Sequence, residues 1–229
     1  MSSFLSFDTP YGYRMRFHPS AVSAAMWENR QFHREEVELL LSFLQQGDTY
    51  IDIGANVGSL TLAASMKVGP QGRVFAIEAC PRTVRYLRQN IEINRAQNIT
   101  LIHAAVGKEA GNVRFTDKFN DDMNHVGEGD CEVPCITLDS LGIQGSIALL
   151  KSDTEGFEVD VIAGGTETLL RTKRAIFECS EWNLNRYHKS TIDMTRALSE
   201  LGFTLTYQSG QQLPVDYIGV AGGNILAMR

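Results

Sequence analysis

The fold is decided by a stretch in the first quarter of the chain, which reads Tyr50-Ile51-Asp52-Ile53-Gly54-Ala55-Asn56-Val57-Gly58-Ser59-Leu60. Its first four residues have the length and the β-branched content of a buried strand, and the residues after the second glycine fit the start of a helix. Glycines at such a junction allow a tight turn and a close approach of the backbone to a ligand. The stretch therefore predicts a strand, a ligand-binding loop and a helix in succession.

Outward from this loop, apolar runs of strand length alternate with helical patterns. The strands are expected at 49–53, 73–77, 99–103, 147–152, 174–179, 203–207 and 224–229, the helices at 58–68, 81–95, 158–171 and 190–201, and a strand-rich stretch at 112–138. Such alternation predicts the α/β class, with a doubly wound, mainly parallel, seven-stranded sheet. A ligand would then bind beyond the carboxyl ends of the strands.

The segment before the first sheet strand has a different pattern. Residues 4–17 alternate around Pro10, Tyr11 and Gly12, which predicts a hairpin, and helices are expected at 20–29 and 34–46. We interpret residues 1–47 as a hairpin and helical cap that belongs to the same domain as residues 48–229.

Composition restricts the partners. The 229 residues carry a formal net charge of -6, so nothing predicts a basic surface for nucleic acid. The four cysteines lack zinc-ligand spacing. Neither a leader peptide nor an apolar run of membrane-spanning length is recognisable, which leads us to expect a soluble, cytoplasmic protein without a membrane partner. The oligomeric state cannot be read from these features.

The chemistry of the loop argues against a phosphate-containing cofactor. A dinucleotide loop would read GxGxxG, but Asn56 replaces the middle glycine and the strand ends in the carboxylate of Asp52. S-adenosylmethionine carries no phosphate and brings a cationic sulfonium and ammonium, which an acid tolerates. We therefore expect this cofactor at Asp52, Gly54, Asn56 and Gly58.

Two further strand ends fit adenosine. Glu78 closes the strand at 73–77, at the place where an acid can hold both ribose hydroxyls. The next strand is followed by small residues, among which Ala105 would leave room for a flat adenine ring.

The strand at 147–152 delivers charge to the same edge. It runs into Lys151-Ser152-Asp153-Thr154-Glu155-Gly156-Phe157-Glu158, and the neighbouring strand ends near Glu178 and Glu181. Ionisable groups at the end of a buried strand are candidates for function. Asp153 is expected to act both on the cofactor and in catalysis.

With these motifs in place, the chain resembles the FkbM family of Rossmann-like class I methyltransferases between about Glu35 and Ser180. The resemblance rests on 52–58, 72–78, the Asn90 to Asn94 stretch and, most specifically, the block at 151–158. It implies S-adenosylmethionine-dependent methylation of a hydroxyl on a small-molecule natural product, a sugar or a glycan. Family members often carry an aromatic-Glu-Pro element before the loop, where this chain has Phe32-His33-Arg34-Glu35-Glu36.

Methylation of an alcohol requires removal of a proton, for which a positioned base is worth about 10²–10⁴-fold. The candidates are Asp153, Glu155 and His125, with His188 as a further histidine. A metal could replace the base, but two acids from separate strands are few ligands for Mg²⁺, so no metal is expected. The acceptor should be contacted by the N-terminal helices, residues 117–130 and residues 208–223.

Three other functions stay open at this point. A nicotinamide-dependent oxidoreductase could use a similar sheet, although its loop and hydride-site pair are not recognisable. A nucleic-acid or other N-methyltransferase is a second possibility, although an Asp/Asn-Pro-Pro-aromatic block does not follow the fourth strand. The third is a domain that binds the cofactor without catalysis.

Overall fold

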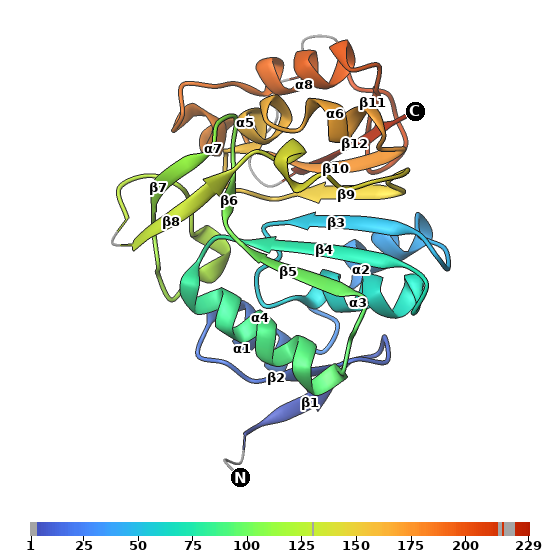
Figure 1. Ribbon diagram of the computed structural model, residues 1–229, viewed down its shortest axis with the longest axis vertical. Helices are drawn as coiled ribbons and strands as arrows, with labels where there is room; N and C mark the ends of the chain where they lie inside the picture. The colour runs from blue at the N-terminus through green and yellow to red at the C-terminus, as the bar shows by residue number, and fades with distance from the viewer. Residues whose placement is uncertain (1–3, 130, 215–216, 218–222) are drawn as a thin grey trace.

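The computed structural model describes residues 4–129, 131–214, 217 and 223–229, and is built around one large sheet (Figure 1). The order of its strands is β11 (Thr204–Tyr207), β12 (Gly223–Met228), β10 (Arg174–Cys179), β9 (Leu149–Ser152), β3 (Thr49–Ile53), β4 (Arg73–Glu78) and β5 (Ile99–His103). β12 is antiparallel to both of its neighbours and the other pairs are parallel. The predicted seven-stranded, mainly parallel sheet is confirmed.

Helices cover both faces of the sheet. One face carries α5 (Glu158–Ala163), α6 (Thr166–Leu170) and α8 (Thr191–Glu200), and the other carries α2 (Arg34–Ser42), α3 (Ser59–Val68) and α4 (Pro81–Asn94). Strand β3 lies in the middle and is buried along its whole length. Its alternate residues serve opposite cores, with Ile51 and Ile53 facing α5 and α8 and Tyr50 facing α2 and α3.

The N-terminal segment packs on the face that α2, α3 and α4 cover (Figure 1). Strands β1 (Ser6–Asp8) and β2 (Arg14–Arg16) form the expected hairpin, and α1 (Ala21–Glu28) follows. Two amide side chains of α4 hold the hairpin, because Asn90 and Asn94 accept the N–H groups of Arg16 and Arg14 at 2.9 and 2.7 Å.

Three helices differ from the sequence prediction. The helix expected at 158–171 is divided into α5 and α6 by Gly164 and Gly165. A Cβ on Gly164 would lie 2.0 Å from the carbonyl oxygen of Gly107, so the chain passes here without a side chain. Helix α2 ends at Ser42 rather than at 46, and the short helix α7 (Glu181–Asn185) was not predicted.

A second, three-stranded sheet stands at one end of the large sheet (Figure 1). It consists of β6 (Ala105–Val106), β8 (Cys131–Ile136) and β7 (Gly111–Phe115), and the 3₁₀ turns η1 (Asp121–Met123) and η2 (Asp139–Leu141) flank β8. Among the described residues, every helix is too short or too polar to cross a bilayer.

Candidate active site

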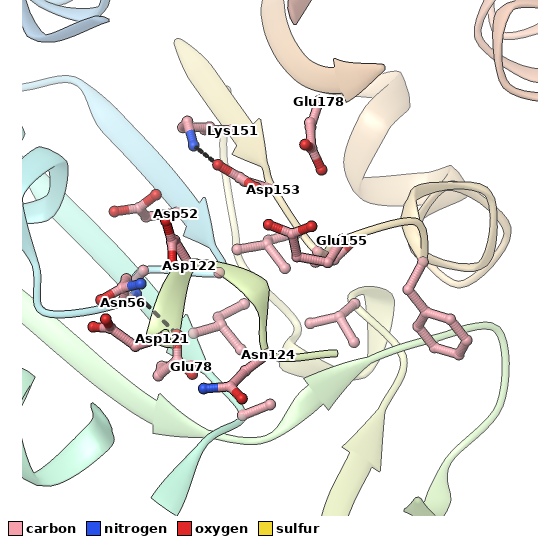
Figure 2. Close-up of a pocket in the computed structure, with 18 of the residues that line it drawn as sticks. Asp52, Asn56, Glu78, Asp121, Asp122, Asn124, Lys151, Asp153, Glu155 and Glu178 are labelled. Atoms are coloured by element: carbon pink, nitrogen blue, oxygen red, sulfur yellow. Dashed lines mark hydrogen bonds and ion pairs between the residues drawn. The ribbon is translucent and has the colours of Figure 1, made fainter. Parts of the chain in front are cut away.

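A cavity opens beyond the carboxyl ends of β3, β4, β9 and β10, where the sheet topology predicts a ligand (Figure 2). The cavity and its mouth together hold about 1060 Å³. Its acidic lining residues come from the strand ends, from α2 and from η1: Glu36, Asp52, Glu78, Asp121, Asp122, Asp153, Glu155 and Glu178. Lys151 and His33 are the basic lining residues among the described part of the chain. The cavity is therefore suited to a ligand with positive charge.

The glycine loop lies against the end of β9. Gly54 has a φ of +81°, and a Cβ at this position would lie 1.8 Å from the carbonyl oxygen of Asp153. The N–H groups of Gly54 and Ala55 both donate to the carbonyl of Ile77, at 2.9 and 3.0 Å. These contacts fix the loop between β4 and β9, and Gly54, Ala55 and Asn56 all line the cavity.

Asp52 lies beneath the loop. It is 1% exposed and accepts hydrogen bonds from the hydroxyls of Tyr50 and Thr61. Burial raises the pKa of Asp52, although Lys151 and the two hydroxyls oppose the shift. Each carboxylate oxygen of Asp52 therefore has a hydroxyl donor within the protein, and these two hydrogen bonds hold the carboxylate at the edge of the cavity.

Glu78 lies at the end of the cavity that is formed by β4 and the glycine loop. One of its oxygens accepts the N–H of Asn56 and the other accepts that of Cys80, both at 2.8 Å. Burial raises the pKa of Glu78 to about 7, although the hydrogen bonds from these two N–H groups oppose the rise. The charge of Asp121 adds to it. Small and apolar residues line the cavity beside it, namely Ala79, Ala104, Ala105, Phe115 and Val126. Together these residues give this end of the cavity an apolar wall beside the carboxylate of Glu78.

A buried lysine organises the acids at the opposite end. The Nζ of Lys151 lies 2.7 Å from Asp153 Oδ2 and 3.8 Å from Glu36 Oε1. Burial alone would lower the pKa of Lys151, but the attraction of Asp153, Glu36 and Asp52 raises it above its usual value. Lys151 is therefore a permanent cation that fixes the orientation of Asp153 (Figure 2).

Glu155 is directed into the cavity by an unusual turn. Its φ is +56° and that of Gly156 is +104°, and a Cβ on Gly156 would lie 2.2 Å from the carbonyl oxygen of Asn183. A side chain rarely adopts such a φ, and residues that do so are concentrated at functional sites. Burial, followed by repulsion from Asp153, raises the pKa of Glu155 to about 8.

Glu178 completes this end of the cavity. The Asn183 amide donates to Glu155 Oε2 at 2.8 Å and to Glu178 Oε1 at 3.4 Å, whereas Glu178 Oε2 is buried without a hydrogen-bond partner in the described part of the chain. Burial and the charges of Asp153 and Glu155 raise its pKa to about 9. Asp153, Glu155 and Glu178 each place one oxygen within 4.8 Å of the others, a grouping that could also hold a cation.

Two predicted site residues are not part of the cavity wall. Gly58 is the N-cap of α3 and has a φ of +93°, and a Cβ there would lie 2.3 Å from the side chain of Leu87. His125 shares a hydrogen bond with the carbonyl of Met123 at 3.0 Å, and its neighbours Asn124 and Val126 line the cavity instead. Glu181, which we expected near the mouth, accepts the N–H of Thr191.

Several lining residues were not singled out from the sequence. Glu36 comes from the segment that departs from the family's aromatic-Glu-Pro element, and it nevertheless supplies an acid beside Lys151. Asp121, Asp122 and Asn124 come from η1 and the residue after it. The one available signal was the density of polar residues at 120–124, within the stretch expected to face the acceptor. Part of the other such stretch, 215–216 and 218–222, lies outside the described residues.

Known proteins with similar sequences include methyltransferases that act on different substrates. The chain is 27% identical over 176 residues to hexuronic acid methyltransferase AglP of Haloferax volcanii, covering 73% of this chain and 71% of that protein. It is 29% identical over 171 residues to 2-O-methyltransferase NoeI of Sinorhizobium fredii, covering 63% and 69%. It is 32% identical over 117 residues to a protein-L-isoaspartate O-methyltransferase of Triticum aestivum, and spans about half of that protein's length.

Solved structures share the fold at low sequence identity. Methyltransferase FkbM from Methylobacillus flagellatus superimposes with a TM-score of 0.52 at 15% identity, covering 80% of this chain and 43% of that one. SMU.1697c of Streptococcus mutans, described as a methyltransferase and solved in complex with SAH (S-adenosylhomocysteine), gives 0.52 at 11% identity, covering 85% and 96%. A sequence model of the methyltransferase FkbM domain matches residues 52–205. The chain therefore belongs to the FkbM family and is an S-adenosylmethionine-dependent methyltransferase.

Proposed function

We propose that this methyltransferase transfers the methyl group of S-adenosylmethionine to a hydroxyl oxygen of a small molecule, a sugar or a glycan. The observation that carries the proposal is the division of one cavity into two ends. Glu78 and the apolar residues beside it suit adenosine, while Asp153, Glu155 and Glu178 gather at the other end. The names of AglP and NoeI, which denote a hexuronic acid methyltransferase and a 2-O-methyltransferase, support a sugar acceptor.

The residues present fit the cofactor. When bound, S-adenosylmethionine supplies a methyl group on a positively charged sulfur. The acids of the cavity match that charge, and Glu36 and Asp52 lie near Lys151 where the amino-acid end would be held. Asp121 Oδ2 and Glu178 Oε2, which are buried without partners among the described residues, are available to donors of a ligand.

For the acceptor we assign different roles to two neighbouring carboxylates. Asp153 is held in place by Lys151 at 2.7 Å, so we give it the task of orienting the acceptor hydroxyl. Glu155 receives the proton, because a pKa of about 8 is close to neutral pH and favours proton transfer from the alcohol. The bound cofactor would supply the methyl group to the acceptor oxygen, and its sulfur would keep the electron pair of the broken bond, while Glu155 holds the proton and Asp153 orients the hydroxyl.

The test measures release of S-adenosylhomocysteine with a panel of hydroxylated glycosides and natural products. With an accepted substrate, we expect Glu155→Gln to lower kcat by about 10²–10⁴-fold and to flatten the rise of rate with pH. Asp153→Asn should lower kcat while S-adenosylhomocysteine still binds. Glu181→Gln is the matched control, because Glu181 accepts the N–H of Thr191 and does not line the cavity.

Each part of the proposal can be contradicted by a particular result. If methyl groups entered nucleic acid or protein carboxylates but none of the hydroxylated compounds, the proposed acceptor would be wrong. If Glu155→Gln and Glu181→Gln had equal kcat, the assignment of the base would be wrong. If the chain bound the cofactor but methylated none of the acceptors, the proposed catalytic function would be wrong and the domain would be a cofactor-binding module.

Metal activation of the hydroxyl is a second possibility, favoured by the grouping of Asp153, Glu155 and Glu178. We expect no metal requirement, because Lys151 already neutralises Asp153 and Asn183 donates to both glutamates. EDTA should therefore leave turnover unchanged. If EDTA abolished turnover and Mg²⁺ restored it, a metal ion rather than Glu155 would activate the hydroxyl.

A further inference from the structure

Residues 116–126, in the loop between β7 and β8, contribute to one wall of the cavity and are held by hydrogen bonds and an ion pair. The N–H of Thr116 donates to the carbonyl of His125 at 3.1 Å, and Arg82 forms an ion pair with Asp117 at 2.7 Å. Asn124 is occupied within the loop, because its oxygen accepts the N–H of Lys118 and its amide nitrogen donates to the carbonyl of the same residue. The loop therefore presents its remaining polar groups to the cavity in fixed positions.

Asp121 differs from the rest of this loop. It is 7% exposed and lines the cavity, and its Oδ1 accepts the N–H of Val22 in the first turn of α1 at 3.1 Å. Its Oδ2 is buried and has no partner within the described residues. In Figure 2 Asp121 lies beside Asn56 and Glu78, at the adenosine end of the cavity.

Capping of α1 alone does not explain this arrangement. One acceptor oxygen is enough for the cap, and a buried carboxylate oxygen without a donor is unfavourable. The N–H groups of Asn56 and Cys80 are not free to donate to Asp121, because they already donate to the two oxygens of Glu78. Lys151 is paired with Asp153 at the other end. Asp121 Oδ2 is therefore left as a free acceptor on the cavity wall within the described residues, and a ligand that enters the cavity can bring the donor.

We infer that Asp121 Oδ2 accepts a hydrogen bond from the adenosine part of the cofactor, and that Asp121 thereby couples cofactor binding to the N-terminus of helix α1. Adenosine offers two sources of donor, the ribose hydroxyls and the exocyclic amine. This role is independent of the acceptor and goes beyond the proposed hydroxyl methylation.

The central experiment uses Asp121→Asn and calorimetry with S-adenosylhomocysteine. The amide oxygen of the variant can still accept the N–H of Val22, but its NH₂ then faces the donor of the ligand. We expect at least tenfold weaker binding at an unchanged melting temperature. Glu128→Gln is the control, because Glu128 is an exposed acid of the same loop that does not line the cavity. If Asp121→Asn lowers the melting temperature, calorimetry is run well below the transition, at a temperature at which the variant is fully folded.

Analogues identify the donor. S-inosylhomocysteine lacks the exocyclic amine, and the 2′-deoxy and 3′-deoxy analogues of S-adenosylhomocysteine each lack one hydroxyl. The analogue without the contacting group should bind the wild-type chain more weakly than S-adenosylhomocysteine does, and should show no further loss in the variant. If affinity were the same in wild type and variant, or if every analogue lost affinity equally in both, the inference would be overturned.

Hydrogen exchange gives a readout that a purely structural cap would not produce. Bound S-adenosylhomocysteine should slow exchange in residues 21–28 of the wild-type chain. At equal saturation with ligand, this protection should be reduced in the Asp121 variant and retained in Glu128→Gln. Equal protection in all three proteins would exclude the coupling to α1.

Discussion

At the scale of single residues, Glu78 has two tasks in the same position. It fixes the glycine loop through the N–H of Asn56, and it is the cavity acid that we propose as an acceptor for the adenosine hydroxyls. We expect Glu78→Ala to weaken binding of S-adenosylhomocysteine by about 10- to 150-fold, which corresponds to the loss of about 1.5–3 kcal/mol for a hydrogen bond to a charged group. Calorimetry measures this directly, and unchanged affinity would refute the assignment.

The pH dependence of the same binding is an internal control. Hydroxyl groups donate to the ionised carboxylate, and burial raises the pKa of Glu78 to about 7. Affinity should therefore be constant above this pH and decline as the pH falls below it. The decline should disappear in Glu78→Ala.

How well a site residue could be predicted depends on the element that carries it. Asp52 and Glu78 lie at the carboxyl ends of parallel strands and Asp153 directly follows one, so the rule that a ligand binds beyond such strand ends singles them out from the sequence. Glu36 and Asp121 could not be placed in this way. Glu36 reaches Lys151 only because α2 docks on the sheet, and Asp121 lies in a loop that has no periodic pattern.

At the scale of elements, the contact between the glycine loop and the end of β9 is predicted to be essential. Gly54→Ala places a Cβ where the carbonyl oxygen of Asp153 lies 1.8 Å away, at a φ of +81°. We expect the free energy of unfolding to fall by about 1–3 kcal/mol or more, because the backbone must shift to remove the overlap. Chemical denaturation measures the change. Gly111→Ala is the control, since no atom lies within 4 Å of its Cβ, and equal stability of the two variants would contradict the prediction.

The order of the elements was predictable, because apolar runs alternate clearly with helical patterns along most of the chain. The interruption between α5 and α6 was less visible, since Gly164 and Gly165 lie within an otherwise helical pattern. The close approach of Gly107 that requires a residue without a side chain arises only in the folded chain. Helix α7 is five residues long, which is too short for a periodic signal.

At the scale of the whole molecule, the acids of the cavity make the ligand-free protein sensitive to pH. The pKa is raised to about 8 for Glu155 and to about 9 for Glu178, far above the value of about 4.5 in an unfolded chain. The folded state then holds more protons than the unfolded state, so stability falls as the pH rises. Buried His18, whose pKa is lowered to about 4, opposes this trend only below about pH 6.5.

We therefore expect the melting temperature of the ligand-free protein to decrease steadily between pH 6.5 and 9. Glu178→Gln should reduce the slope, and bound S-adenosylmethionine should stabilise most at high pH, where the carboxylates that attract it are ionised. Thermal denaturation at a series of pH values tests these outcomes. A melting temperature that rises over this range would show that the carboxylates are ionised at neutral pH in the absence of ligand.

The antiparallel strand β12 also determines when the seven-stranded sheet can be completed. It lies between β10 and β11 although it is the last strand in the chain, and β11 pairs with no other strand of the described sheet. During synthesis on the ribosome, β3, β4, β5, β9 and β10 can assemble as the chain emerges, while β11 must wait for residues 223–228. Until these residues are released, the nascent chain exposes the free edge of β10, and this is the stage at which a chaperone would be needed most.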